Sequence, residues 1–439
     1  MIIPSIDIQG GRAVQLRQGR EFILDGGDPM DRLEEFSIAG EVAVIDLDAA
    51  LGTGSNRELI QNMARAFPIR VGGGIRTRED AESWLNAGVK KVIIGTNASE
   101  TFCSVLPKDR IIAAVDAVRG EVVVDGWQEQ TGESVLDRIR RLAPFVGGFL
   151  LTQVEFEGGL SGYDRELIGS AQEAASGVRI TAAGGIRSAD DVADLDQLKV
   201  DAQVGMALYT GRLSLGETIA ACLNRPVDGR FWPTVVCNEQ GGTLGLVWST
   251  AESVSAAVEQ RRGIYWSRTR DKLWFKGATS GNTQQLLRVD LDCDRDALRY
   301  TVEQHGGFCH LGTKSCWSDS FDLSSLVTTL RARIAAQDPD SGTVRLANNL
   351  SLLREKLIEE AIELGEATER DEVIHEAADL LYFLSVAIAN ASVSFDDIIN
   401  ELELRNRRVV RRPMHSKGPA SSEEVVSEYP LAQSDAASS

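Results

Sequence analysis

The chain has 439 residues, of which 43% are hydrophobic and 25% charged, a composition typical of a globular protein with roughly two to four domains. Its formal net charge of −19 argues against binding to nucleic acid, because a phosphate backbone requires a basic surface. The longest apolar stretch, 380–391, is too short to span a bilayer, and no basic leader precedes the first apolar run. We therefore expect a cytoplasmic protein with no nucleic-acid or membrane partner.

Residues 1–223 alternate short β-branched runs with helical segments, which is the pattern of a parallel β/α fold. This segment also repeats itself. The motif Gly-Gly-Ile-Arg occurs at 73–76 and again at 184–187, and the turn that begins at Gly95 is matched by the one at Gly205. Two similar halves of four β/α units each predict a (β/α)8 barrel.

The duplicated glycine turns predict two phosphate sites, because a turn between a strand and a helix presents backbone N–H groups to an anion. A substrate with a phosphate at each end would fit both. The phosphate-binding residues that we assign are Gly73, Gly74, Gly95, Thr96, Gly184, Gly185 and Gly205. Asp7 and Asp116 lie on matching strands of the two halves, where one can act as acid and the other as base. The alternative is that either aspartate caps a helix or only pairs with an arginine.

A break at 224–230 precedes a second domain, 226–323, whose aromatic residues and turns predict a compact α+β unit. One run in this domain offers hydroxyl, amide and backbone donors to a phosphate. It consists of Thr279, Ser280, Gly281 and Asn282. Three tryptophans, Trp266, Trp274 and Trp317, either stack on a base or belong to the core.

The segment 290–316 gathers three cysteines, four aspartates and two histidines in 27 residues, which indicates metal binding. Cys293, Cys309 and Cys316 would leave one zinc position open, as in a catalytic site. If 289–294 is extended, its aspartates and Cys293 point to opposite faces, so magnesium and zinc would lie on opposite sides. Cys293 would then serve a zinc whose other ligands come from a neighbouring subunit. A disulfide or buried free thiols are the alternative.

Residues 324–415 have helical periodicity, and acids gather on two of the expected helices. One helical face carries Lys356, Glu359, Glu360 and Glu363, and the next helix carries Glu376 and Asp379. Carboxylates that converge from two helices bind magnesium and, through it, a polyphosphate, whereas the alternative is a charged surface. The basic run 405–412 either binds phosphate or balances a helix dipole. Residues 416–439 predict a disordered tail.

These motifs resemble three consecutive enzymes of histidine biosynthesis joined in one chain. The runs YWSRTRDKLWFKGATSGN, DCDRDAL and CHLGTKSC resemble phosphoribosyl-AMP cyclohydrolase over nearly its whole length. The resemblance implies zinc at the three cysteines, with Cys293 donated across a homodimer. It implies magnesium at Asp292, Asp294 and Asp296. His310, next to a zinc ligand, is either a proton shuttle or a structural histidine.

The helical domain is similar to phosphoribosyl-ATP pyrophosphatase, whose EExxE and ExxD motifs are matched by the acids at 359–363 and 376–379. This chain has Ser-Gly-Thr at 341–343 where that family has Ser-Tyr-Thr. The resemblance implies magnesium-dependent release of pyrophosphate from phosphoribosyl-ATP, followed by opening of the purine ring between N1 and C6 in the central domain.

The first domain resembles the phosphoribosylformimino-aminoimidazole carboxamide ribotide isomerase, in which aspartates at the positions of Asp7 and Asp116 accept and donate protons. The family's Thr-Asp-Ile-x-x-Asp-Gly-Thr segment begins here at Thr152 but has Gln153 and Glu157 in place of its two aspartates. A usual arginine is Gln15. The resemblance implies a multifunctional enzyme with an isomerising barrel. The alternative is a bifunctional hydrolase whose barrel is only structural.

Overall fold

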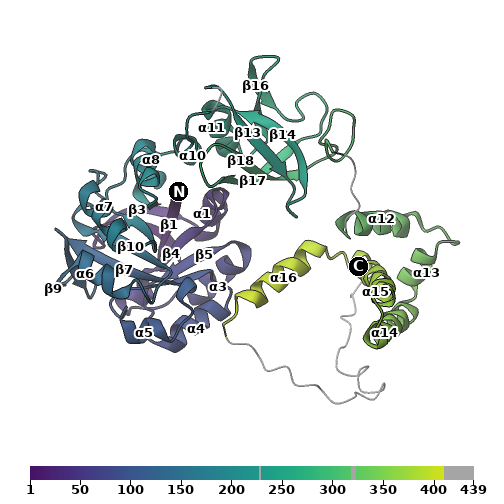
Figure 1. The fold of residues 1–439 in the computed structure, drawn as a ribbon, viewed down its shortest axis with the longest axis horizontal. Coiled ribbons are helices and arrows are strands. Elements are labelled where there is room, and N and C mark those ends of the chain that lie inside the picture. The colour runs from purple at the N-terminus through teal and green to yellow at the C-terminus, as the bar shows by residue number, and fades with distance from the viewer. Residues whose placement is uncertain (227–228, 318–322, 410–439) are drawn as a thin grey trace, which may run out of the picture.

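A computed structural model describes residues 1–226, 229–317 and 323–409, so the expected tail at 416–439 lies outside the described residues. Figure 1 shows the barrel, the central domain and the helical domain in chain order. Eight parallel strands close the predicted barrel, because β10 pairs with β7 and β12 pairs with β1. In barrel order they are β1 (Ile2–Gln9), β4 (Val42–Asp46), β5 (Ile69–Gly72), β6 (Lys91–Ile94), β7 (Ile111–Val118), β10 (Gly148–Gln153), β11 (Arg179–Ala183) and β12 (Asp201–Val204).

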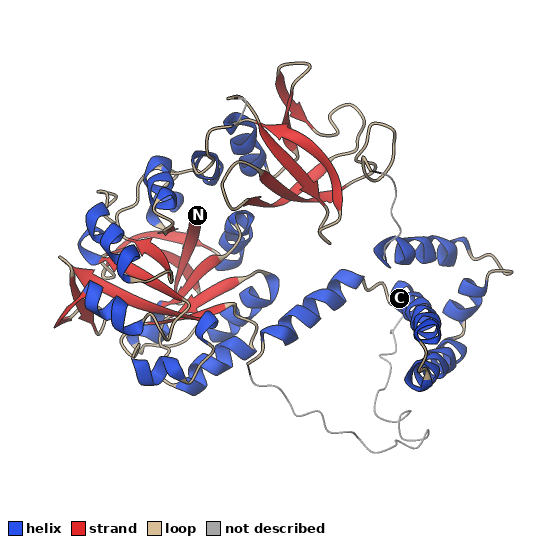
Figure 2. Cartoon of the chain, in the orientation of Figure 1, coloured by secondary structure: helices blue, strands red, loops and turns tan. Residues whose placement is uncertain are grey.

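Helices surround the barrel, as Figure 2 shows, and all of them except α2, which has no buried residue and borders the mouth pocket, bury apolar side chains. They are α1 (Pro29–Phe36), α2 (Leu47–Leu51), α3 (Arg57–Ala66), α4 (Arg78–Asn86), α5 (Glu100–Ser104), α6 (Val135–Leu142), α7 (Arg165–Ala174), α8 (Ala189–Gln197), α9 (Met206–Tyr209) and α10 (Leu215–Ala221), with 3-10 turns η1 (Ser37–Ala39), η2 (Lys108–Arg110) and η3 (Val154–Phe156). A smaller apolar cluster, Ile93, Ile112, Leu150 and Ala183, comes from four different strands and fills the middle of the barrel.

Two antiparallel extensions widen the barrel sheet at matching places. The hairpin of β2 (Arg12–Arg17) and β3 (Glu21–Gly27) follows β1, and the hairpin of β8 (Glu121–Val124) and β9 (Glu129–Ser134) follows β7. Both leave the carboxyl ends of the strands that carry Asp7 and Asp116. The internal repeat therefore extends to the insertions around the mouth of the barrel.

The central domain is the predicted α+β unit. Its four-stranded sheet has the order β14 (Thr243–Ser249), β13 (Trp232–Cys237), β18 (Leu298–Gln304) and β17 (Gln284–Leu291). The helix α11 (Ala251–Gln260) and the hairpin of β15 (Ile264–Ser267) and β16 (Lys272–Phe275) complete it. Trp274 packs against the fully buried Tyr265, with ring centroids 5.7 Å apart, which supports a core role, whereas Trp317 is 58% exposed.

The C-terminal region is all-helical and has its own core around Leu330, Leu353 and Val386. Its helices are α12 (Leu323–Ala336), α13 (Gly342–Asn348), α14 (Leu350–Glu366), α15 (Arg370–Asn390) and α16 (Phe395–Arg407). Helix α16 returns to the barrel, where Arg110 donates a 2.9 Å hydrogen bond to the Arg407 carbonyl. Arg405 and Arg407 each pair with a glutamate one turn earlier, which favours the charge-balancing interpretation of the basic run as far as residue 409.

Within the described ranges no single helix has the length and apolar composition of a membrane span. The pair α15 and α16 passes that test by length and composition when taken together, with a bend of 105° between them.

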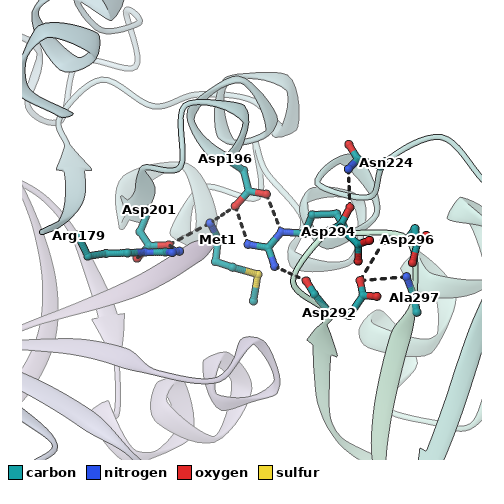
Figure 3. Close-up of polar contacts among 10 residues, drawn as sticks. Met1, Arg179, Asp196, Asp201, Asn224, Asp292, Asp294, Asp296 and Ala297 are labelled. Atoms are coloured by element: carbon teal, nitrogen blue, oxygen red, sulfur yellow. Dashed lines mark hydrogen bonds and ion pairs between the residues drawn. The ribbon is translucent and has the colours of Figure 1, made fainter. Parts of the chain in front are cut away.

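The central domain is fixed to the barrel through the turn 292–297, which joins β17 to β18. Arg295 in this turn forms a bidentate ion pair with Asp196 of α8, at 2.8 and 3.0 Å. Asn224 donates a 2.5 Å hydrogen bond to the Asp294 carbonyl. Figure 3 shows Asp196 lying between Met1 and this turn. The aspartate-rich turn is therefore held against the barrel instead of projecting freely into solvent.

Candidate active sites

A pocket of about 660 Å³ lies at the carboxyl ends of the barrel strands. All of the barrel residues that the sequence analysis assigned to catalysis or phosphate binding line it, from both halves of the repeat, together with Thr152. They are Asp7, Gly73, Gly74, Gly95, Thr96, Asp116, Thr152, Gly184, Gly185 and Gly205. Because three strands separate β1 from β7 on either side of the closed barrel, Asp7 and Asp116 face the pocket from opposite walls.

The glycine turns of the pocket require glycine for steric reasons. Gly73 has φ of +98°, and a Cβ there would collide with the Asp46 carbonyl oxygen. Gly184, the equivalent residue in the second half of the repeat, has φ of +96°, and a Cβ there would collide with the Gln153 carbonyl oxygen. Both turns bring backbone close to the neighbouring strand and leave their N–H groups near the pocket. Gly95 differs, because a Cβ there would meet no other atom within 4 Å. At this position the glycine leaves room in the pocket.

Besides the exposed Asp125, three partly buried carboxyl groups line the pocket, and burial is the largest cause of the pKa shift of each. Burial raises the pKa of Asp7 to about 7. It also raises the pKa of Asp116, although hydrogen bonds from Trp127 and Thr152 oppose the shift. The pKa of Glu157 rises to about 8, through burial and then through repulsion by the other two carboxylates. Groups poised near neutrality are suited to proton transfer, so the pocket has the electrostatics of an acid–base site.

These shifts predict a stability that falls with rising pH. Between roughly pH 4 and pH 8 the folded barrel holds more protons than the unfolded chain, because Asp7 and Glu157 ionise later when folded. Substrate-free protein should therefore lose roughly 4 °C or more in Tm across that window. Scanning calorimetry of the wild type and of an Asp7→Asn, Glu157→Gln double variant checks this. An equally steep pH dependence in both proteins would refute the assignment.

The replaced positions of the barrel have identifiable roles. Gln153 is buried and bridges the loop before α7, accepting from the Asp164 N–H at 2.8 Å and donating to the Asp164 carbonyl at 3.1 Å. Gln15 is buried and packs beneath Gly205. Trp127, which the sequence motifs did not single out, lines the pocket and contacts Asp116. Its isolated position in a hairpin loop gave no periodic signal.

In the central domain, two of the three cysteines lie together. The thiols of Cys309 and Cys316 are within hydrogen-bonding reach of each other, and backbone N–H donation from Leu311 lowers the pKa of Cys309. Cys293 is exposed in the 292–297 turn, and the three thiols do not form a common cluster. The residues present fit a two-thiol half-site that a third thiolate from elsewhere would complete.

Two further groups approach the thiol pair. The Nδ1 atom of His310 lies 3.7 Å from the Cys309 sulfur. Lys276 is buried, and its Nζ donates a hydrogen bond to the Asn282 carbonyl at 3.1 Å. Burial lowers the pKa of Lys276, and the nearby Cys316 and Cys309 oppose this shift. Lys276 thus connects the 279–282 turn to the thiols. The sequence reasoning passed over it, although it stands inside the quoted motif next to this turn.

The carboxylates of Asp292, Asp294 and Asp296 gather as expected, but the geometric premise behind their expected separation from Cys293 was wrong. Strand β17 ends at Leu291, so the alternation of an extended strand does not reach these residues. The turn 292–297 instead brings oxygens of the three aspartates within 4.8 Å of one another. Asp290 is not part of this cluster and pairs with Arg288 and Arg299. Three oxygen ligands at this spacing fit a magnesium ion.

In the helical domain, α14 and α15 bring three acids together. Oxygens of Glu360, Glu376 and Asp379 lie within 4.8 Å of one another, and Glu360 is only 6% exposed. Glu363 contacts Glu376, and both burial and this neighbour raise the pKa of Glu363. Lys356 forms ion pairs with Glu359 at 2.8 Å and Glu360 at 3.9 Å. Mutual repulsion of carboxylates that gather around the buried Glu360 fits a magnesium site better than a merely charged surface.

The fold and these sites define a multidomain protein in which a (β/α)8 barrel with a glycine-lined mouth pocket precedes two domains with clustered metal-type ligands. Three family models match consecutive parts of the chain. They are histidine biosynthesis protein at residues 1–214, phosphoribosyl-AMP cyclohydrolase at 245–318 and phosphoribosyl-ATP pyrophosphohydrolase at 323–406. The chain belongs to the histidine biosynthesis protein family and carries the domains of the other two families after its barrel.

Named relatives match different portions of the chain. The phosphoribosyl imidazole-4-carboxamide isomerase of Methanocaldococcus jannaschii is 33% identical over 237 residues, covering 51% of this chain and 100% of that protein. The histidine biosynthesis bifunctional protein of Schizosaccharomyces pombe is 42% identical over 207 residues, 47% of this chain and 49% of that protein. The trifunctional protein of Saccharomyces bayanus is 40% identical over 219 residues, 49% of this chain and 27% of that protein. The match thus spans about half or less of these fungal proteins.

Proposed function

We propose that the chain catalyses three consecutive steps of histidine biosynthesis. The helical domain hydrolyses phosphoribosyl-ATP to phosphoribosyl-AMP and pyrophosphate, the central domain opens the purine ring between N1 and C6, and the barrel isomerises the resulting ribotide. The observation that carries the third step is the intact mouth pocket, in which both aspartates and both phosphate turns converge. A scaffold barrel would have no need to keep them together, so the bifunctional alternative is disfavoured.

The chemistry of the two hydrolytic steps rests on ligand clusters of the chain. Magnesium held by Glu360, Glu376 and Asp379 would neutralise a polyphosphate, and zinc held by thiolates would supply Lewis acidity. Lys356 contributes a cation beside the acid cluster for the same phosphates. His310 lies where it can move a proton next to the thiol pair, and Lys276 and the 279–282 turn can hold the substrate phosphate.

In the barrel, the two aspartates would divide the proton transfers of an aldose-to-ketose isomerisation. Asp116, held by Thr152 and Trp127, donates a proton to the ribose ring oxygen. Asp7, with its pKa near 7, removes the proton at C2 from the opposite side. Glu157 remains largely protonated at neutral pH and can donate a hydrogen bond to the substrate.

The proposal includes a homodimer as the working unit. Cys293 stands apart from the Cys309 and Cys316 pair, so a second copy can supply the missing thiolate. Helices α14 and α15 also expose Ile358, Ile362 and Ile374 at 49%, 55% and 52%, an apolar surface that a second copy would cover. Because its charged nucleotide substrates do not cross membranes unaided, we place the protein in the cytoplasm.

The test is complementation of three single-deletion histidine auxotrophs, one for each step. The wild-type gene should restore growth without histidine in all three strains. Asp7→Asn should abolish rescue of the isomerase-deficient strain alone and lower isomerase kcat by about a thousandfold or more. Rescue of only the two hydrolase-deficient strains by the wild-type gene would instead establish the bifunctional alternative.

A further inference from the structure

A second cavity, of about 280 Å³, lies at the end of the barrel opposite the mouth pocket. The amino ends of the barrel strands line it, and Arg288 of the central domain closes one side. Figure 3 shows three of its lining residues, Met1, Arg179 and Asp201, next to the junction between the domains. Neither the isomerisation nor the two hydrolytic sites use this cavity.

The cavity is basic although the chain as a whole is strongly acidic. Its side-chain cations are Arg70, Lys90, Lys91, Arg179 and Arg288. The acids that pair with them are Glu41, Asp201 and Asp290. Five side-chain cations against three acids leave two positive charges in excess, and these acids serve further cations as well. Asp290 is shared with Arg299, and Asp201 is shared with the Met1 ammonium, which also lines the cavity and pairs in addition with Asp196. Such an excess at a partly buried site is costly unless an anion balances it.

Lys91 is the cation that lacks a partner. It begins β6 and is half-buried, yet within the described part of the chain its Nζ has no acidic atom within 4.0 Å and no hydrogen-bond acceptor. The nearby carboxylate of Glu41 is already shared by Arg70, through Oε1 at 2.5 Å, and Lys90, through Oε2 at 3.2 Å. Burial lowers the pKa of Lys91, which agrees with an ammonium group whose charge is poorly balanced.

Arg288 brings the central domain into the same cavity. Its guanidinium lies over Gly40, where a Cβ would stand 3.7 to 3.8 Å from it, and the side chain is 44% exposed. An anion bound here would contact cations of both domains. The volume lies near the lower end of the range of small-ligand sites, roughly 300 Å³, so it suits a small anion rather than a whole nucleotide.

We propose that this cavity is a second anion site, distinct from the mouth pocket, which binds inorganic phosphate or pyrophosphate between Lys91 of the barrel and Arg288 of the central domain. The bound anion supplies the two missing negative charges and ties the two domains together. Since β17 leads from Arg288 directly to Asp292, the anion also steadies the strand that ends at the aspartate turn.

The first test compares Lys91→Met with the control Lys108→Met, which removes a lysine on the same side of the barrel from outside the cavity. Phosphate or pyrophosphate is titrated at constant ionic strength with EDTA present, and Tm is followed. Without anion, Lys91→Met should melt at or above the wild-type temperature. Of phosphate and pyrophosphate, the anion that the wild type binds more tightly should bind to Lys91→Met about tenfold or more weakly. The Lys108→Met control should bind it as the wild type does.

The second test locates the anion. Crystals of the full chain soaked in tungstate, a phosphate analogue, should show anomalous density within reach of Lys91 and Arg288, and Arg288→Met should remove it. Density confined to the mouth pocket would overturn the proposal. So would a Lys91→Met protein that melts below the wild type without anion and responds to phosphate unchanged, because Lys91 would then serve only the ion-pair network.

Discussion

Two inactive variants, Cys293→Ser and Cys309→Ser, should regain about a quarter of the wild-type cyclohydrolase activity when they are mixed and allowed to exchange subunits. Each alone should lose about a thousandfold or more, because zinc would lack a thiolate. In the mixed dimer, one site combines the intact Cys293 of one copy with the intact Cys309 and Cys316 of the other. Half of the dimers are mixed and each has one of two sites, which gives the quarter.

A matched mixture provides the control. Cys309→Ser and Cys316→Ser remove two thiols that lie side by side in the same half-site, so their mixed dimers contain no complete site and should stay inactive. Pyrophosphatase activity of every variant should remain within about twofold of the wild type, since the helical domain has a separate core. Failure of the first mixture to recover would place all three zinc ligands within one copy.

The fold was readable from the sequence because its strongest signals are local and repeated. Gly73 and Gly184 must be glycine to adopt positive φ against a neighbouring strand, so their motifs mark two equivalent turns. Thr77 and Ser188, four residues further on in each case, cap α4 and α8 in the same way. Backbone requirements of this kind can be recognised from residue types in the sequence, and they predicted the position of the mouth pocket correctly.

Contacts between residues that come together only through tertiary packing could not be predicted from the sequence. Nothing around Lys91 or Arg288 reveals that residues almost 200 positions apart line one cavity. Lys276 reaches the thiol pair because the turn after β16 folds back over it, which periodicity does not describe. The prediction of an extended strand through the aspartate segment was wrong for a related reason. Its alternation suggested a strand, but Arg295 takes a left-handed φ of +63° and its ion pair with Asp196 helps hold the segment in a turn.

Replacing Glu360 by Gln should have opposite effects on stability and on catalysis in the helical domain. Burial, followed by repulsion from Glu363 and Asp379, raises the pKa of Glu360, so at neutral pH its ionised form destabilises the metal-free fold. The variant should therefore melt at a higher temperature than the wild type in EDTA. It should also lose about a hundredfold or more of its pyrophosphatase kcat, because one magnesium ligand is gone.

The measurement is a pair of Tm values, in EDTA and in magnesium, together with pyrophosphate release from phosphoribosyl-ATP. Wild-type Tm should rise with magnesium, since the cation relieves the repulsion among Glu360, Glu376 and Asp379, whereas the Glu360→Gln value should change little. Glu355→Gln, an exposed change on the same helix, should behave as the wild type in both assays. If Glu360→Gln melts lower in EDTA, the ion pair with Lys356 outweighs the repulsion and the cluster is structural.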